Sequence, residues 1–174
     1  MTLHQNNPYN ARMSTLKNKF RVAIVGGPKT GKTTLSHQLA DGANIAVRHT
    51  DELIPLGWSE ASETAAQWFN DDGPWVIEGV AVARALRKWL RQCDTFRSTG
   101  EMENSTLTVK PCDRLIVLER PWVDLSAGQL AMGKGVFTVL DEVLPELVTI
   151  GVEIEWEQHV PPVGNVGTRY KVFS

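Results

Sequence analysis

The chain has 174 residues and a formal net charge of −2, with 42% hydrophobic and 22% charged residues. This composition is typical of one globular domain with its own core, and it excludes a protein that holds nucleic acid through a global positive field. The two cysteines, Cys93 and Cys112, lack metal-site spacing and predict free thiols in a reducing compartment. No apolar run reaches transmembrane length, so we expect a cytoplasmic protein without a membrane partner.

The most informative stretch follows a polar segment, residues 1–20, which predicts an N-terminal tail. An apolar, β-branched run over 22–25 predicts a buried strand. The chain continues as Gly26-x-x-x-x-Gly31-Lys32-Thr33, the P-loop pattern, and a helix is expected over 32–40. A chance match in a glycine-rich turn is the alternative, and it is disfavoured because strand, loop and helix come in the order that the motif requires.

The spacing of this motif suits a nucleoside triphosphate. Glycines let the main chain turn tightly, so that successive N–H groups point at phosphate oxygens, and the dipole of the following helix favours the same anions. Lys32 is expected to reach the β- and γ-phosphates, and the Thr33 hydroxyl is expected to ligate Mg²⁺. We therefore predict a site for ATP and Mg²⁺ made by Gly26, Gly27, Pro28, Lys29, Thr30, Gly31, Lys32, Thr33 and Thr34.

Two further predicted strands end on acidic residues. A strand over 45–49 runs into Asp51, and a strand over 75–77 runs into Glu78. In an open α/β sheet, groups that contact ligands lie at the carboxyl ends of the strands. Asp51 is therefore a candidate catalytic base, although it also fits the N-cap of the next turn or helix. Glu78 is a candidate Mg²⁺ ligand of the Walker B type.

Between these strands we expect an apolar loop over 53–58 and a helix over 59–69 that is capped by Ser59 or Ser62. After them, a helix is expected over 80–93, with an apolar face for the core.

The opposite face of this second helix carries four cations, Arg84, Arg87, Lys88 and Arg91. Such a stripe suits a polyanion such as DNA, and it suits an ordinary solvated helix surface equally well. Arg84 lies nearest to the preceding strand end, so it is the cation expected to reach a substrate.

The second half of the chain begins with a polar insertion over 94–111, followed by a strand over 115–118. Residues 121–135 hold several glycines around Lys134, which predicts a flexible lid that closes over phosphates, with an ordinary surface loop as the alternative. The remaining expected elements are a helix over 136–148, a strand over 152–156 and a C-terminal tail over 161–174.

Strands and helices alternate along the chain, which predicts a parallel sheet with helices on both faces. Residues 21–160 resemble the P-loop kinases of the nucleotide-kinase type, and this resemblance implies a P-loop NTPase fold with sheet order 2-3-1-4-5. Glu78-Gly79 followed by Arg84 resembles the Asp-Gly…Arg stretch of adenylate-kinase-like enzymes, with glutamate in place of aspartate. Asp51 resembles the acceptor-activating aspartate of polynucleotide kinases.

A narrower resemblance rests on the stretches 75–80, 118–121 and 128–135, which are similar to small phage-type P-loop kinases. Some of that group phosphorylate 5-hydroxymethyluracil within DNA. The resemblance implies a kinase in the host cytoplasm that phosphorylates the 5-hydroxymethyl group of a modified pyrimidine in phage DNA. A base flipped out of a duplex is expected to stack on Trp58 or Trp68, or to leave a gap that one of them fills.

For this reaction, Asp51 is expected to take the acceptor proton and Glu78 to order the metal. A kinase of a free nucleoside or nucleotide, and a non-catalytic NTP-binding regulatory module, remain as alternatives. The cations expected to neutralise charge on the transferred group are Lys29, Lys32, Arg84, Arg120 and Lys134.

Overall fold

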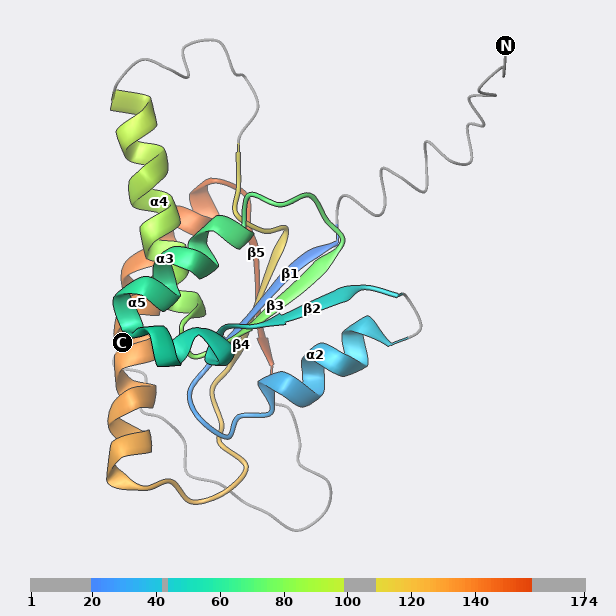
Figure 1. Cartoon of the computed structure of the whole chain (residues 1–174), viewed down its shortest axis with the longest axis vertical. Coiled ribbons are helices and arrows are strands. Elements are labelled where there is room, and N and C mark those ends of the chain that lie inside the picture. The colour runs from blue at the N-terminus through green and yellow to red at the C-terminus, as the bar shows by residue number, and fades with distance from the viewer. Residues whose placement is uncertain (1–19, 42–43, 99–108, 158–174) are drawn as a thin grey trace.

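The structure is a computed structural model that describes residues 20–41, 44–98 and 109–157 (Figure 1). The expected tails, and the part of the polar insertion at 99–108, lie outside the described residues. None of the helices in the described ranges has the length and apolar character needed to cross a membrane.

A five-stranded parallel sheet forms the centre of the molecule, as predicted. Its strand order is β2-β3-β1-β4-β5, which confirms the expected order. The central strands are buried because they are covered on both faces, and such strands read as continuous apolar runs in the sequence. The five strands are β1 (Arg21–Gly26), β2 (Ala46–His49), β3 (Trp75–Gly79), β4 (Arg114–Leu118) and β5 (Glu153–Glu157).

Helices cover both faces of this sheet. Figure 1 shows α2 on one side and α3, α4 and α5 on the other. Alternate residues of β1 serve the two sides: Val22 and Ile24 pack with Leu35 of α2, whereas Ala23 and Val25 belong to the larger core under the other three helices. The helices are α2 (Lys32–Ala40), α3 (Trp58–Trp68), α4 (Val82–Ser98) and α5 (Ala127–Thr149).

The largest difference from the sequence-based expectation concerns the glycine-rich segment 121–135. Its second part is helical, because α5 begins at Ala127 rather than near residue 136. Ser126 and Gln129 form a capping box, in which each side chain bonds the other residue's backbone N–H. This cap and the buried positions farther along the helix outweigh the cost of about 1 kcal/mol for each helical glycine. The prediction of a flexible loop over 127–135 was therefore wrong.

Two other boundaries also differ from expectation. Helix α4 extends to Ser98, five residues beyond the predicted end at 93, and so enters the expected insertion. The expected loop over 53–58 is largely a 3-10 helix, η1 (Thr50–Leu56).

The expected serine caps of the next helix were wrong as well. Helix α3 follows Gly57, whose φ of 94° suits glycine, and its N-cap makes no side-chain hydrogen bond. The Ser62 hydroxyl instead donates to the Trp58 carbonyl within the same helix.

Candidate functional site

The loop between β1 and α2 turns in the way that the motif predicts. A Cβ added to Gly26 would lie 2.7 Å from the Leu118 carbonyl oxygen, so this position accepts only glycine without a shift of the neighbouring strand. Lys29 and Gly31 have left-handed φ values of 59° and 91°, which bend the loop toward the start of α2. No side chain caps this helix at Gly31, so its first N–H groups are not used by a cap.

Lys32 is the charged centre of the loop. Its side chain is buried, and its Nζ donates to the Gly27 carbonyl at 2.6 Å. Burial lowers the pKa of Lys32, while the carboxylates of Asp51 and Glu78 act in the opposite direction. An ammonium held in this way is poorly solvated, so an anion that entered the loop would relieve much of the cost of burying it.

Glu78 lies beside the first turn of α2, at the end of β3. Its Oε1 accepts from the Thr33 hydroxyl at 3.1 Å and lies 2.5 Å from His49 Nδ1. The contact with His49 follows from the register of the sheet, in which His49 of β2 is paired with Glu78 of β3. The side chain is 1% exposed, and its second oxygen, Oε2, has no partner within the described chain.

The unpartnered Oε2 fits a cation at this position. A buried carboxylate oxygen without a hydrogen bond is costly unless a ligand satisfies it, and the Thr33 hydroxyl lies on the same carboxylate. The described residues contain no group of three His, Cys, Asp or Glu side chains that could hold a metal by themselves. A free carboxylate oxygen beside a hydroxyl suits Mg²⁺, which usually takes one or two protein oxygens and completes its shell with phosphate oxygens and water.

Asp51 lies in η1, just after the end of β2. Its Oδ1 accepts from the Val80 backbone N–H at 3.1 Å, and the Thr50 hydroxyl accepts from the Ala81 N–H at 3.3 Å. Asp51 thus does cap a backbone N–H group, but that group precedes α4 rather than the next helix in the chain. The exposed side chain also lines the cavity described below, and within the described residues its Oδ2 has no protein partner.

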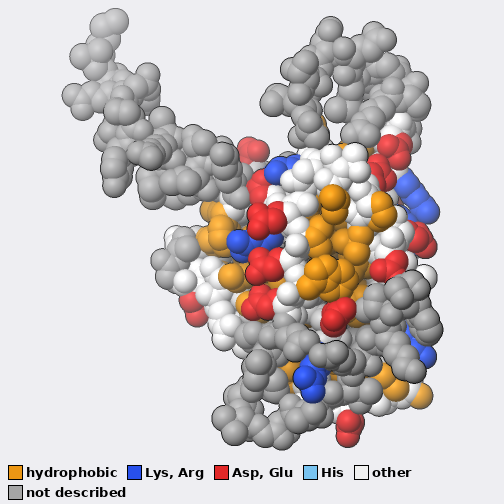
Figure 2. All heavy atoms as spheres, turned by 180° about the vertical axis from the view of Figure 1, so that it is seen from behind, with side chains coloured by type: hydrophobic (Ala, Val, Ile, Leu, Met, Phe, Trp, Pro, Cys, Tyr) orange, Lys and Arg blue, Asp and Glu red, His pale blue; other side chains and the backbone are white. Residues whose placement is uncertain are grey.

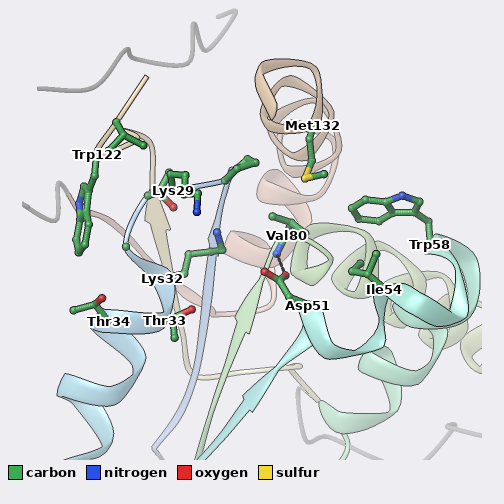
Figure 3. Close-up of a pocket in the computed structure, with 14 residues that line it drawn as sticks. Lys29, Lys32, Thr33, Thr34, Asp51, Ile54, Trp58, Val80, Trp122 and Met132 are labelled. Atoms are coloured by element: carbon green, nitrogen blue, oxygen red, sulfur yellow. Dashed lines mark hydrogen bonds between the residues drawn. The ribbon is translucent and has the colours of Figure 1, made fainter. Parts of the chain in front are cut away.

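The loop between β1 and α2 and the side chain of Asp51 face the same cavity, which has a volume of about 570 Å³ (Figure 3). Figure 3 shows Trp122 beside the loop at one end and Trp58 at the other, with Lys32 and Asp51 between them. A second hollow of about 260 Å³ shares Trp58 and Met132 with the first. The first cavity is lined by Pro28, Lys29, Thr30, Gly31, Lys32, Thr33, Thr34, Asp51, Ile54, Trp58, Val80, Trp122, Val123 and Met132.

The predicted cations are distributed unevenly around this cavity. Lys29 and Lys32 line it, and Arg84 lines the second hollow, where its guanidinium carbon lies 4.9 Å from the centre of the Trp58 ring. Arg120 and Lys134 line neither hollow, although Arg120 stands two residues before Trp122, whose backbone N–H bonds the loop at the Lys29 carbonyl.

Ion pairs with neighbouring helices partly neutralise the cationic stripe on α4. Arg87 pairs with Glu142 of α5 at 3.1 Å, and Lys88 pairs with Glu63 of α3 at 3.0 Å. The stripe lies between two helices that supply these acids, so it is not a purely solvated surface. These pairs leave fewer positive charges for a polyanion than the sequence pattern indicated.

Sequence reasoning missed three residues of the site. His49 contacts Glu78, Trp122 donates its backbone N–H to the Lys29 carbonyl at 2.6 Å, and Met132 lines both hollows. His49 and Trp122 follow the rule that placed Asp51 and Glu78, because they lie at or just after the carboxyl end of a strand. Met132 could not be found in this way, since it lies on α5.

Comparison with protein-family models finds no match, and comparison with curated proteins finds no relative of this chain.

Proposed function

We propose that this chain is an ATP-dependent kinase with a P-loop NTPase fold, which transfers the γ-phosphate of ATP to a hydroxyl group. The observation that carries the proposal is the buried Lys32 ammonium, held over a tight glycine turn and facing the same cavity as Asp51. A buried lysine with a lowered pKa is costly in the free protein, and a triphosphate is the type of ligand that this loop geometry suits.

In the proposed reaction, Lys32 holds the β- and γ-phosphates while Asp51 receives the acceptor proton through Oδ2. As that proton leaves, the acceptor oxygen bonds to the γ-phosphorus, the bond from this phosphorus to the β–γ bridging oxygen breaks, and ADP departs with that oxygen. The Val80 N–H holds the Asp51 carboxylate in one orientation, which keeps it at the edge of the cavity.

Thr33 and Glu78 are the residues that would hold Mg²⁺, and His49 orients Glu78 from the other side. When bound, Mg²⁺ supplies positive charge that neutralises the phosphate oxygens during transfer. The chain's own contribution is to hold the Glu78 carboxylate in one position through Oε1, with Oε2 left for the metal.

The first candidate acceptor is the 5-hydroxymethyl group of a modified pyrimidine in DNA, which rests on the resemblance to phage-type kinases. The second is a free nucleoside or nucleotide, and the ion pairs of Arg87 and Lys88 favour it, because they remove charge from the expected DNA-binding stripe. Among the described residues on the face in Figure 2, acidic side chains run beside a hydrophobic patch, and the basic ones stand apart from each other.

A transfer assay with γ-labelled ATP tests this function. The acceptors are nucleosides, nucleotides, and plain and hydroxymethylated DNA, and Lys32→Ala serves as the inactive control. We expect label transfer to a hydroxymethylated acceptor that is abolished in Lys32→Ala. ATP binding without transfer to any acceptor would instead support a regulatory NTP-binding module.

The salt dependence of the same assay separates the two acceptors. Transfer to DNA through phosphate contacts falls steeply with added salt, whereas transfer to a free nucleoside changes little. For DNA, charge reversal at Arg87 and Arg91 should weaken DNA binding without affecting ATP binding.

An Asp51→Asn variant should lose most of its kcat while it keeps ATP affinity, and normal values of both would show that Asp51 is structural.

A further inference from the structure

The end of the cavity that lies away from the P-loop has a distinct chemistry. Ile54, Trp58, Val80 and Met132 give it apolar walls, and Asp51 stands where these walls meet the phosphate-binding part (Figure 3). We call Trp58, Val80 and Met132 the Trp58 wall, because these three residues line both the main cavity and the second hollow. The wall therefore extends from Asp51 to Arg84.

The two ends of the Trp58 wall carry opposite charges. Asp51 stands at the inner end, and Arg84 stands at the outer end, with its guanidinium over the Trp58 ring at 4.9 Å. Among the described residues, Arg84 makes no ion pair with a carboxylate, unlike Arg87 and Lys88 on the same helix. Its N–H groups are therefore available to an oxygen atom of a ligand that lies along the wall.

A planar ring suits this wall better than an aliphatic chain does. The faces of Trp and of a guanidinium both stack on heterocycles, and the soft sulfur of Met132 also packs well against aromatic rings. Met132 is 37% exposed although it is hydrophobic, as expected for a wall that a ligand covers. A ring with carbonyl oxygens on its edge would also present acceptors to Arg84.

The size of the cavity limits what can bind along the wall. The two hollows have volumes of about 570 and 260 Å³, and a site for one small ligand commonly has 300–1,000 Å³. The two hollows are therefore of the size that small-molecule sites have.

We propose that the Trp58 wall is the acceptor site, and that it takes one planar, carbonyl-bearing heterocycle of nucleobase size whose hydroxyl arm reaches Asp51. The role given to Asp51 rests on the proposed kinase function. The binding of the ring does not, because it depends on the wall and on Arg84. Trp58 is thus the residue that selects a planar acceptor.

Equilibrium binding measured by calorimetry tests the wall, with three probes and three variants. The probes are 5-hydroxymethyl-2′-deoxyuridine, thymidine, which replaces the hydroxymethyl by a methyl group, and cyclohexylmethanol, which has a hydroxyl arm on a ring that is not planar. The variants are Trp58→Ala, Trp58→Phe and Trp156→Ala. Trp156 is 47% exposed on β5 and lines neither hollow, so it is the matched control.

We expect both nucleosides to bind the wild-type protein, and Trp58→Ala to weaken this binding by about tenfold or more, the usual effect of removing a stacking residue. Trp58→Phe should restore most of the affinity, and Trp156→Ala should bind as the wild type does. Cyclohexylmethanol should bind the wild type no better than it binds Trp58→Ala. ATP affinity should be the same in all variants, which also shows that they are folded.

The wall assignment is overturned if the wild type binds neither nucleoside, or if Trp58→Ala binds them as tightly as the wild type. A parallel transfer assay judges the kinase function separately. Nucleoside binding that depends on Trp58, without phosphate transfer, would refute the kinase and keep the wall. Transfer with an acceptor KM that Trp58→Ala leaves unchanged would refute the wall and keep the kinase.

Discussion

Substitution of Gly79 by alanine tests the geometry that holds Asp51 at the cavity. Gly79 ends β3 with a φ of +138°, a conformation that side chains rarely adopt. A Cβ at this position would lie 2.0 Å from Thr50 Oγ1 and 2.8 Å from Asp51 Oδ1. The variant must therefore move both side chains, which are the ones that cap the backbone N–H groups before α4.

The loss of stability in Gly79→Ala has two sources. Backbone strain at such a residue costs about 1–3 kcal/mol. Displacement of Thr50 leaves the buried N–H of Ala81 without its acceptor, which costs about another 1–3 kcal/mol. We expect Gly79→Ala to lower the free energy of unfolding by about 2–6 kcal/mol, and to lower Tm by roughly 2–4 °C for each kcal/mol in a chain of this size.

Urea and thermal unfolding of the nucleotide-free protein measure this change, with Gly135→Ala as the matched control. A Cβ at Gly135 meets nothing within 4 Å and lies inside α5, so this variant should gain about 0.8 kcal/mol. If the two variants were to unfold within about 0.5 kcal/mol of each other, the contact between Gly79 and Thr50 would not exist as described. Gly79→Ala should also lose phosphate transfer more than ATP affinity, because it displaces Asp51.

Three other changes test the site and the core. Lys32→Met should abolish transfer yet stabilise the nucleotide-free protein at neutral pH, because it removes a buried charge. The Gly27 carbonyl still accepts a hydrogen bond from the Thr30 hydroxyl in this variant. The folded-state pKa of Lys32 is lowered, so wild-type stability should rise with pH toward 10.5, and pH-dependent unfolding should show no such rise in the variant. Glu78→Gln should raise the Mg²⁺ concentration for half-maximal turnover by about tenfold or more, whereas an unchanged Mg²⁺ titration would remove Glu78 from the metal site. Burial raises the pKa of the Cys112 thiol to about 12, so in a Cys93→Ser variant a thiol reagent at pH 8 should label the protein only after unfolding.

Much of the fold was predictable from local patterns. The apolar run over 22–25 and the spacing of Gly26, Gly31 and Lys32 predicted a strand, a tight turn and a helix, and all three are present. Such patterns work because strand pairing, glycine backbone freedom and helix initiation depend on residues within a few positions of each other. The start of α5 was missed although its signal was local: Ser126 and Gln129 form a readable capping box that the glycines obscured.

Which residues the fold brings together around the cavity was predictable only in part. The rule that ligand-contacting residues follow strand ends placed Asp51 and Glu78 at the same edge of the sheet as the loop after β1, because all strands of the sheet are parallel. The rule gives no information on residues that come from helices. Arg84 was named only because its helix follows a strand end closely, whereas Met132 and the α5 acid that pairs with Arg87 were outside the reach of the rule.

The sequence by itself determined most of the strands and helices and the glycine turn between β1 and α2, since these are encoded within short windows. Tertiary structure alone decided that His49 meets Glu78, that Asp51 caps Val80, and that Trp58 and Met132 share one cavity. These contacts join segments about 30 or more residues apart, and they depend on strand register and helix packing. No local pattern carries that information, because register and packing are set by the whole core at once.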